Sequence, residues 1–359
     1  MAKKAKVSIA VSVLASSVYL SGCGLLSFGD DKEKIDPPQD LSYLKEGEKV
    51  DTAKGEEAEK EVNKEEEANA ETVMTELYLI DKNGYVVSQS LPLPGEESVA
   101  KQAIEYLVKN GPVENVLPNG FRAVLPADTQ VTVDIKEGTA IADFSPEFNN
   151  YQPEDEQRIL QSVTWTLTQF DSVEKVELRV NGYPLTEMPV NGTPIDEKGL
   201  TRKVGINVDT SGVVDPTSTK PLTVYYVSQT DDKSYYVPVT KRVSSNSVDE
   251  VTAVVNELID GPGYSSSLAS DFTGAKLLDD PKLEDGTVTL NFNEAVYGSL
   301  EEKMVSEHML NSLVLSLTEQ KGIKGVSVLV NGEATVVSKD GETITEPVTR
   351  PENVNTISF

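Results

Sequence analysis

The residues of this sequence that could carry catalysis are few and lie far apart. The chain has one histidine, His308, and one cysteine, Cys23. A transition-metal site of the usual type needs several Cys, His or carboxylate ligands around one ion, and a lone His without a free Cys does not supply them. The sequence also lacks the Gly-x-Ser-x-Gly turn, a phosphate-binding Gly-rich loop ending in Lys-Ser or Lys-Thr, and a dinucleotide fingerprint. We therefore predict no metal, no cofactor and no nucleotide chemistry.

Paired carboxylates are the remaining chemical candidates, because two acids about 5 to 9.5 Å apart can hydrolyse glycans. The nearest candidate pairs are Asp143 with Glu147 and Asn291 with Glu294. The position that corresponds to Asp143 in the second half of the chain is Asn291, so the two halves share no acid there. With 59 acidic residues, chance proximity of two acids is common. We predict that the protein is not an enzyme, and a peptidoglycan-active hydrolase or a peptidoglycan-binding module is the alternative.

Two further features have simple structural interpretations. The stretch from Asp81 to Gly84, Asp-Lys-Asn-Gly, resembles the start of a calcium loop. It lacks the later ligands and the glutamate at the twelfth position, so turn chemistry explains it better. His308 corresponds to Arg158 in the first half of the chain, which predicts a position on a helix surface.

The charge of the chain excludes some classes of partner. The 359 residues include 59 Asp and Glu against 32 Lys and Arg, which gives a formal net charge of -27. Binding to nucleic acid phosphates needs clustered Lys and Arg, so we predict no nucleic acid partner. Direct adhesion to an anionic lipid surface is disfavoured for the same reason. A large net charge more commonly keeps a protein soluble.

The N-terminal segment predicts export and a lipid anchor. Three lysines, Lys3, Lys4 and Lys6, precede an apolar run over residues 7–20, which is shorter than the roughly 20 residues that span a membrane. The run leads into Leu-Ser-Gly-Cys, ending at Cys23, which resembles the bacterial lipobox. This resemblance implies lipidation of Cys23, removal of residues 1–22 and a location on the outer face of the cell membrane. An ordinary secretory signal followed by an unrelated cysteine is the alternative. The acidic segment 23–73 has few apolar residues to bury, which predicts a disordered tether.

The rest of the chain is a tandem duplication. Residues 167–182 return as residues 317–332, with Leu-Thr at the start and Val-Asn-Gly at the end of each copy. Residues 137–144 return as 285–292, shifted by 148 rather than 150. A repeat of this length indicates two copies of one domain. We predict the domains at 74–190 and 221–350, joined by an irregular connector at 191–220 and followed by a tail at 351–359.

Each copy predicts an α+β domain with a mixed sheet and two helices packed on one face. In the first copy we expect hairpins at 77–87 and 131–144, helices at 98–109 and 157–170, and a strand at 176–180. In the second copy we expect a hairpin at 222–239, a helix capped by a Ser247 and Glu250 capping box, a helix at 302–320 and a strand at 326–330. Leu160 and its counterpart Leu310 are expected in the core, and Trp165 at the rim. Residues 188–190 resemble 346–348 and are expected as an added edge segment.

Several runs of residues together resemble one known family. Besides the lipobox, the acidic spacer and the duplication, they are residues 35–40 (Ile-Asp-Pro-Pro-Gln-Asp), 79–85 (Leu-Ile-Asp-Lys-Asn-Gly-Tyr), 117–122 (Leu-Pro-Asn-Gly-Phe-Arg) and 163–170 (Val-Thr-Trp-Thr-Leu-Thr-Gln-Phe). The chain is similar to the GerM family of sporulation and germination lipoproteins of endospore-forming Bacilli, which carry two GerMN domains. The resemblance covers nearly the whole chain.

The resemblance implies a fold, a place and a role. It implies a fold akin to the ring-building modules of secretion systems. It also implies a lipid-anchored protein on the outer forespore membrane, facing the intermembrane space. There it would support assembly of the channel complex between mother cell and forespore, with effects on cortex formation and germination. The partners would be protein components of that complex, and self-association stays open. The family offers no catalytic residue to carry over, and only Cys23 matches a functional position.

Overall fold

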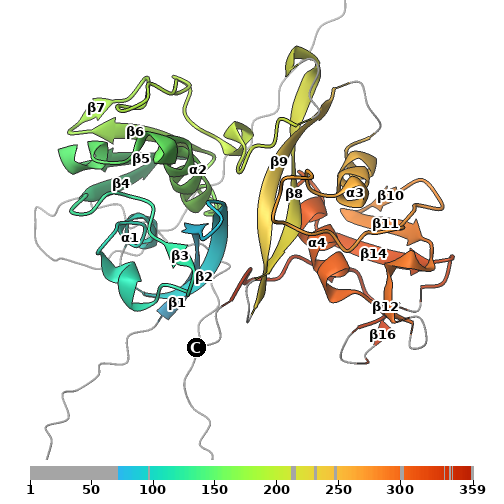
Figure 1. Ribbon diagram of the computed structural model, residues 1–359. Coiled ribbons are helices and arrows are strands. Elements are labelled where there is room, and N and C mark those ends of the chain that lie inside the picture. The colour runs from blue at the N-terminus through green and yellow to red at the C-terminus, as the bar shows by residue number, and fades with distance from the viewer. Residues whose placement is uncertain are drawn as a thin grey trace, which may run out of the picture. The chain divides into compact units, whose positions relative to one another are not determined.

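The computed structural model describes residues 72–95, 98–211, 216–229, 233–245, 249–299, 303–334, 336–338, 341 and 343–356. The predicted signal peptide, Cys23 and nearly all of the predicted tether lie outside the described residues. Within them, the chain runs twice through the same order of elements (Figure 1). The tandem duplication predicted from the sequence is therefore present in the fold.

The first repeat consists of a long hairpin, two helices and a mixed sheet. Its elements are β1 (Thr72–Asp81), β2 (Val86–Pro94), α1 (Val99–Glu105), β3 (Phe121–Arg122), β4 (Val131–Lys136), β5 (Thr139–Phe144), α2 (Glu156–Leu167), β6 (Lys175–Val180) and β7 (Tyr183–Pro184). The mixed sheet has the order β4-β5-β6-β7, with β5 parallel to β6. The hairpin and β3 form a separate sheet in the order β2-β1-β3. Both helices contact the mixed sheet, and they also contact the hairpin.

The second repeat follows the same plan with additional short strands. Its elements are β8 (Thr219–Gln229), β9 (Ser234–Ser244), α3 (Glu250–Asp260), β10 (Lys282–Glu284), β11 (Thr287–Phe292), β12 (Tyr297–Ser299), β13 (Met304–Val305), α4 (Glu307–Thr318), β14 (Gly325–Val330), β15 (Val336–Val337), β16 (Thr343–Ile344) and β17 (Val348–Thr349). The sheet has the order β10-β11-β14-β17, and β11 is parallel to β14 as β5 is to β6. The fourth strands differ, because β17 pairs with the start of β14 whereas β7 pairs with the end of β6. The fold class is α+β, as predicted.

Duplicated turn residues explain why the strands stop where they do. Glu137 and Gly138 between β4 and β5 have φ angles of 48° and 75°, and the equivalent pair Asp285 and Gly286 have 50° and 83°. Two successive residues with positive φ form the turn that suits a two-residue hairpin, and glycine adopts that conformation without strain. The same local sequence signal therefore produces the same hairpin in both repeats.

The helices bury the faces that their apolar spacing predicts. Ile159, Val163 and Leu167 on α2 are fully buried, as are Met309, Leu313 and Leu317 on α4. For two other residues of these helices, the prediction of burial was wrong. Leu310 is only partly buried although its counterpart Leu160 is 4% exposed, and Trp165 is 1% exposed instead of lying at a rim. The Trp165 Nε1 donates to the carbonyl of Gly205 at 3.2 Å, so a connector residue covers the indole.

The helix ends differ from the predicted ones for identifiable reasons. Helix α4 begins at Glu307 rather than at residue 302, because Met304–Val305 pairs as β13 and the Ser306 hydroxyl accepts from the Met309 N–H as the N-cap. Helix α3 is capped by Asp249, whose carboxylate accepts from the Thr252 N–H at 2.9 Å. The predicted Ser247 and Glu250 capping box is therefore wrong, since Glu250 is the first residue of the helix and not the third. Ser247 itself lies outside the described residues.

The added edge segment was also assigned to the wrong residues. In the second repeat, Val348 pairs with Val326 on the edge strand β17. In the first repeat, Val176 pairs with Leu200, not with residues 188–190. Val190 is 39% exposed, and Leu200 of the connector occupies the edge position instead. None of the helices in the described part of the chain combines the length and apolar character needed to cross a bilayer.

Candidate functional site

The acids that could have formed a catalytic pair have structural roles. The Asp143 carboxylate accepts from the backbone N–H of Gly182 at 2.9 Å. In the second repeat, the side-chain oxygen of Asn291 accepts from the backbone N–H of Gly332 at the same distance of 2.9 Å. An amide oxygen serves as well as a carboxylate for this bond, which explains why one repeat has Asp and the other Asn. Both side chains therefore stabilise a turn.

Glu147 and Glu294 lie on the surface in short 3-10 turns, Pro146–Asn149 and Glu294–Val296. The hydrogen bond from Ser145 lowers the pKa of Glu147, and bonds from its own backbone N–H and from Asn331 lower the pKa of Glu294. A general acid needs the opposite shift, toward a raised pKa. These two carboxylates are ionised surface groups without that shift.

His308 lies on α4 as predicted, but it is partly covered. Its Nδ1 is 3.3 Å from the Tyr236 hydroxyl, and the two rings meet edge to face with centroids 6.1 Å apart. Asn311 donates to the same hydroxyl at 2.9 Å. His308 therefore packs against β9 beside polar neighbours, which is a structural contact.

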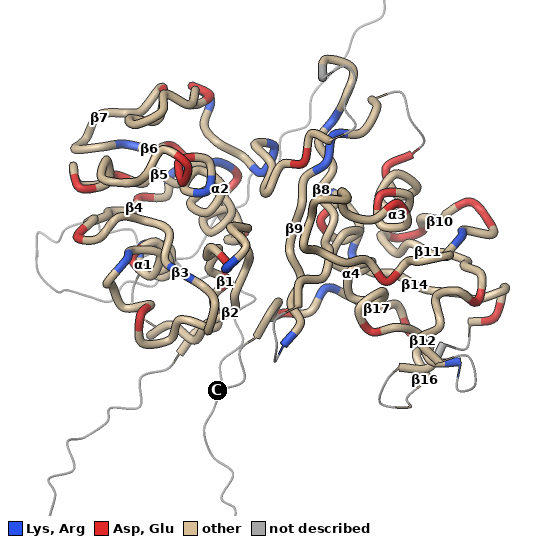
Figure 2. Tube along the Cα trace, in the orientation of Figure 1, with Lys and Arg blue, Asp and Glu red and all other residues tan. Residues whose placement is uncertain are grey.

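The stretch from Asp81 to Gly84 forms a turn. One Asp81 carboxylate oxygen accepts from the N–H groups of Asn83 and Tyr85 at 2.9 and 2.8 Å. The other oxygen accepts from the Tyr235 hydroxyl of the second repeat at 2.8 Å. Among the residues that the structure describes, no three His, Cys, Asp or Glu side chains gather as metal ligands would. Acidic positions are spread over loops and helices of both repeats (Figure 2).

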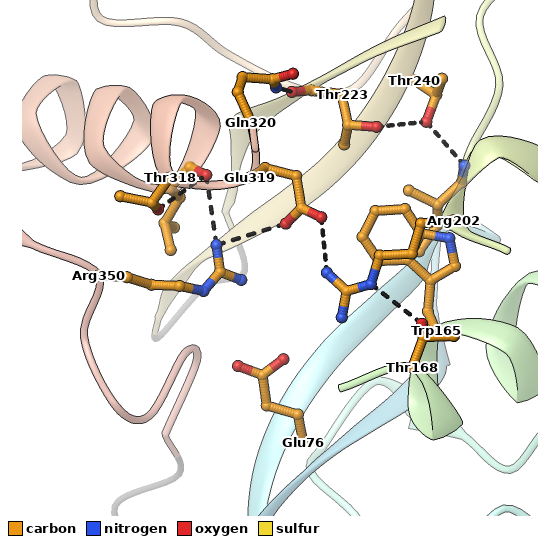
Figure 3. Close-up of polar contacts among 12 residues, drawn as sticks. Glu76, Trp165, Thr168, Arg202, Thr223, Thr240, Thr318, Glu319, Gln320 and Arg350 are labelled. Atoms are coloured by element: carbon orange, nitrogen blue, oxygen red, sulfur yellow. Dashed lines mark hydrogen bonds and ion pairs between the residues drawn. The ribbon is translucent and has the colours of Figure 1, made fainter. Parts of the chain in front are cut away.

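One group of charged side chains joins segments far apart in the sequence, and we call it the Glu319 cluster: Glu319, Arg202 and Arg350. Glu319 follows the last residue of α4, Arg202 follows the edge residue Leu200, and Arg350 follows β17. The two guanidinium groups approach the Glu319 carboxylate from different sides (Figure 3), at 2.7 Å for Arg202 and 3.6 Å for Arg350. The Tyr225 hydroxyl donates to the same carboxylate at 3.1 Å. The cluster thus joins a segment after the first repeat to the second repeat.

Aromatic rings hold both arginines in position. The Arg202 guanidinium lies 4.5 Å from the centroid of a Trp165 ring, and its Nε donates to the Thr168 hydroxyl at 3.1 Å. The Arg350 guanidinium lies 5.4 Å from the Tyr225 ring centroid. Cations over aromatic faces are attracted by about 0.5–2 kcal/mol each. Trp165 and Tyr225 therefore orient the two positive charges toward one acid.

The electrostatics of the Glu319 cluster favour a structural ion pair and not a catalytic group. The Glu319 side chain is 10% exposed, and this burial raises its pKa, but the charges of Arg202 and Arg350 outweigh the effect and lower it overall. A carboxylate with a lowered pKa is a weak base. The three groups also line an open groove of about 1120 Å³ with Glu76. Breaking such a pair leaves an uncompensated, partly buried charge, so the cluster favours a fixed arrangement of the segments it joins.

Sequence reasoning missed the Glu319 cluster. Arg202 belongs to the stretch treated as an irregular connector, and Arg350 is the last residue of the predicted second domain. The available signal was a further piece of the duplication: Leu-Thr-Arg at residues 200–202 and Val-Thr-Arg at residues 348–350, again offset by 148. The aliphatic residue at the start of each stretch pairs with the same strand position of its repeat, Val176 or Val326.

Comparison with known proteins assigns the chain to a family. The family model described as Germane, sporulation and spore germination, matches residues 76–186 and 223–336. The chain is 56% identical over 367 aligned positions to the spore germination protein GerM of Bacillus subtilis (strain 168), covering 100% of both chains. A solved structure of the tandem GerMN domains of that sporulation protein is similar, with a TM-score of 0.76 and 61% identity over 80% of this chain and 100% of that chain. The family model, the relative and the structure agree, so this chain belongs to the Germane family of sporulation and spore germination proteins.

Proposed function

We propose that this protein is a lipid-anchored, non-enzymatic envelope protein needed for sporulation and spore germination. It supports assembly of the channel complex between mother cell and forespore, and through it cortex formation. It is held by lipid on Cys23 at the outer face of the membrane, which in sporulating cells is the outer forespore membrane facing the intermembrane space. Its partners are protein components of that complex.

The observation that carries this proposal is the similarity over the full length to a spore germination protein. The alignment covers both chains completely, so it includes the predicted signal peptide and acidic spacer as well as both repeats. The geometry adds a second argument. Asp143 supports a turn, and Asn291 supplies the same bond in the sister repeat. An acid that an amide replaces at the equivalent site is a poor candidate for a catalytic role.

The test is complementation. We would express the chain in Bacillus subtilis that lacks its own spore germination protein GerM, and count heat-resistant spores and germinated spores. Asp143→Asn, Glu147→Gln and Glu294→Gln should each retain full function, because each change preserves shape and at least one hydrogen bond. Crosslinking in sporulating cells, followed by purification of the chain, should recover envelope proteins of the channel complex.

A peptidoglycan-active or peptidoglycan-binding role predicts a different outcome. One acid-to-amide change would then abolish sporulation while the protein stays folded and its partners are still recovered. Purified protein would release fragments from peptidoglycan or sediment with it. Release of fragments would overturn the non-enzymatic proposal, and sedimentation with peptidoglycan would favour the peptidoglycan-binding alternative.

A further inference from the structure

Each repeat ends in the same short pattern, which we call a latch. Latch 1 is residues 200–207 and latch 2 is residues 348–355. Both have Thr-Arg as their second and third residues, and both end in an aliphatic residue followed by asparagine, at a constant offset of 148. The two final asparagines, Asn207 and Asn355, both have positive φ angles, 46° and 56°. The two latches therefore share a sequence pattern and the conformation of their last residue, although Arg202–Val204 forms a 3-10 helix in latch 1 and the equivalent residues 350–352 of latch 2 do not.

The two asparagines make equivalent bonds in opposite directions. The Asn207 side chain accepts from the Val86 N–H at 2.8 Å and donates to the Val86 and Pro238 carbonyls at 2.7 Å each. The Asn355 side chain accepts from the Tyr236 N–H at 2.8 Å and donates to the Tyr236 and Ser88 carbonyls at 2.8 and 2.9 Å. Tyr236 and Pro238 are Val86 and Ser88 shifted by 150. Each asparagine thus holds its own repeat with two bonds and the other repeat with one.

The residues that precede the two asparagines also form hydrogen bonds to the other repeat. The Ile206 carbonyl of latch 1 accepts from the Thr240 N–H on β9 at 2.8 Å. The Val354 carbonyl of latch 2 accepts from the Ser90 N–H on β2 at 3.3 Å and from the Ser90 hydroxyl at 2.9 Å. Ser90 and Thr240 are again 150 apart. Val354 is 1% exposed, so the described part of the predicted tail packs into the fold.

The contact between β2 and β9 is therefore self-complementary. The asparagine side chains and the carbonyls of the residues before them bond in both directions. The ion pair of Arg202 with Glu319 and the bond from the Ile206 N–H to the Thr240 hydroxyl are made by latch 1, and no bond described for latch 2 matches them. Such an interface has the symmetry of a two-fold homodimer, in which one patch meets its own copy. We propose that this face is also a docking surface for a second copy of the chain. Two copies exchange repeats, and the first repeat of each pairs with the second repeat of the other.

The Glu319 cluster selects which repeats pair. The residue that corresponds to Glu319 in the first repeat is Gln169, whose side chain bonds to the backbone of Glu76. Pairing between two first repeats would bring Arg202 to the neutral amide of Gln169, with Glu76 as the neighbouring acid of the groove, and the direct ion pair with Glu319 would be lost. Pairing of a first with a second repeat supplies Glu319. The exchange is therefore reciprocal and gives a closed dimer. This inference does not depend on the proposed role of the protein in the channel complex.

Charge reversal in separate copies tests the exchange. One full-length copy carries Arg202→Glu and one tag, and the other carries Glu319→Arg and a different tag. Within either copy, like charges now meet. When the two copies exchange repeats, the unaltered Arg202 of one copy meets the unaltered Glu319 of the other. At the second interface the substituted residues meet, and their charges are again opposite. We expect the two copies, extracted together from membranes in detergent, to copurify at least tenfold more than either variant with itself.

The controls separate this surface from others. A single chain with both changes should pair its own repeats again and show the low copurification of the unaltered chain. The proposal is wrong if the two variants fail to copurify while both are folded. It is equally wrong if each variant copurifies as strongly with unaltered chains, since that requires another surface. If either variant is degraded, unaltered chains under two tags decide: copurification that rises with expression supports exchange, and none at any level overturns it.

Discussion

At the scale of single residues, carboxylates in this protein act as acceptors for backbone and side-chain donors. Glu156 is the clearest case. It is the first residue of α2 and is fully buried. It accepts from the Tyr151 hydroxyl at 2.7 Å and from the N–H groups of Asn191 and Thr193 at 2.6 and 3.0 Å. Glu156 thereby fastens the connector to the start of a core helix.

This arrangement predicts a pH-dependent stability. Burial raises the pKa of Glu156, but the bonds from Thr193, Asn191 and Tyr151 outweigh burial and lower the pKa from 4.5 to about 2. Since the folded pKa is the lower one, the stabilisation is complete above pH 4.5 and is lost as the pH falls toward 2. A shift of this size corresponds to roughly 3 kcal/mol.

We expect Glu156→Gln to lower the free energy of unfolding by roughly 2–3 kcal/mol at pH 7, because the amide replaces an ionised acceptor. The difference from the unaltered protein should shrink between pH 4.5 and pH 2. Urea denaturation at a series of pH values measures both. The exposed neighbour Glu154→Gln is the control and should change little at any pH. A penalty for Glu156→Gln that does not vary with pH would contradict this account.

At the scale of elements, α2 and α4 occupy equivalent places in the two repeats, but their equivalent residues are buried to different extents. Leu160 on α2 is 4% exposed and Leu313 on α4 is fully buried, whereas Leu310 on α4 is only partly buried. The apolar spacing is alike in the two helices. What differs is the surrounding chain, because Met304–Val305 pairs as β13 ahead of α4, whereas a 3-10 turn, Pro153–Asp155, precedes α2. Equivalent positions in a duplicated sequence therefore need not carry equal free energy.

Alanine substitutions should reveal this inequality. Leu160→Ala and Leu313→Ala should each cost roughly 2–5 kcal/mol, the range for emptying a well-packed core site. Leu310→Ala should cost less than half as much, since less apolar surface leaves the core. Chemical denaturation of the three variants gives the comparison. Equal losses at Leu310 and Leu313 would mean that α4 is packed differently from the structure described here.

At the scale of the whole molecule, the two repeats share an interface that neither has alone. Val87 on β2 packs into the hydrophobic cluster of the second repeat, and the Phe121 ring meets the Tyr235 ring with centroids 5.3 Å apart. The latches and the Glu319 cluster add polar bonds around these apolar contacts. The partners that we propose would therefore meet a paired set of repeats. The predicted anchor decides where that pair is held.

The anchor gives the prediction at this scale. Cys23→Ala should leave an uncleaved precursor or release the protein from the membrane, because acyl chains supply the stable attachment. Fractionation of cells before and after a high-salt wash, with the size of the product on a gel, measures both outcomes. Cys23→Ser is a closer match in size and should behave alike. Normal maturation of either variant, with the protein still in the washed membranes, would rule out lipid attachment at this residue.

The sequence by itself determined the features that depend on neighbours along the chain. The duplication, the α+β class, the hairpin turn at Glu137 and Gly138 and the buried faces of the helices follow from local spacing, which repeats whenever the local sequence repeats. Tertiary structure alone decided the burial of Trp165, the partial exposure of Leu310 and the meeting of Arg202 with Glu319. These depend on segments more than 100 residues apart or on the loops that cover a helix. Periodicity specifies which face of an element is buried, but it carries no information on which distant segment comes to cover it.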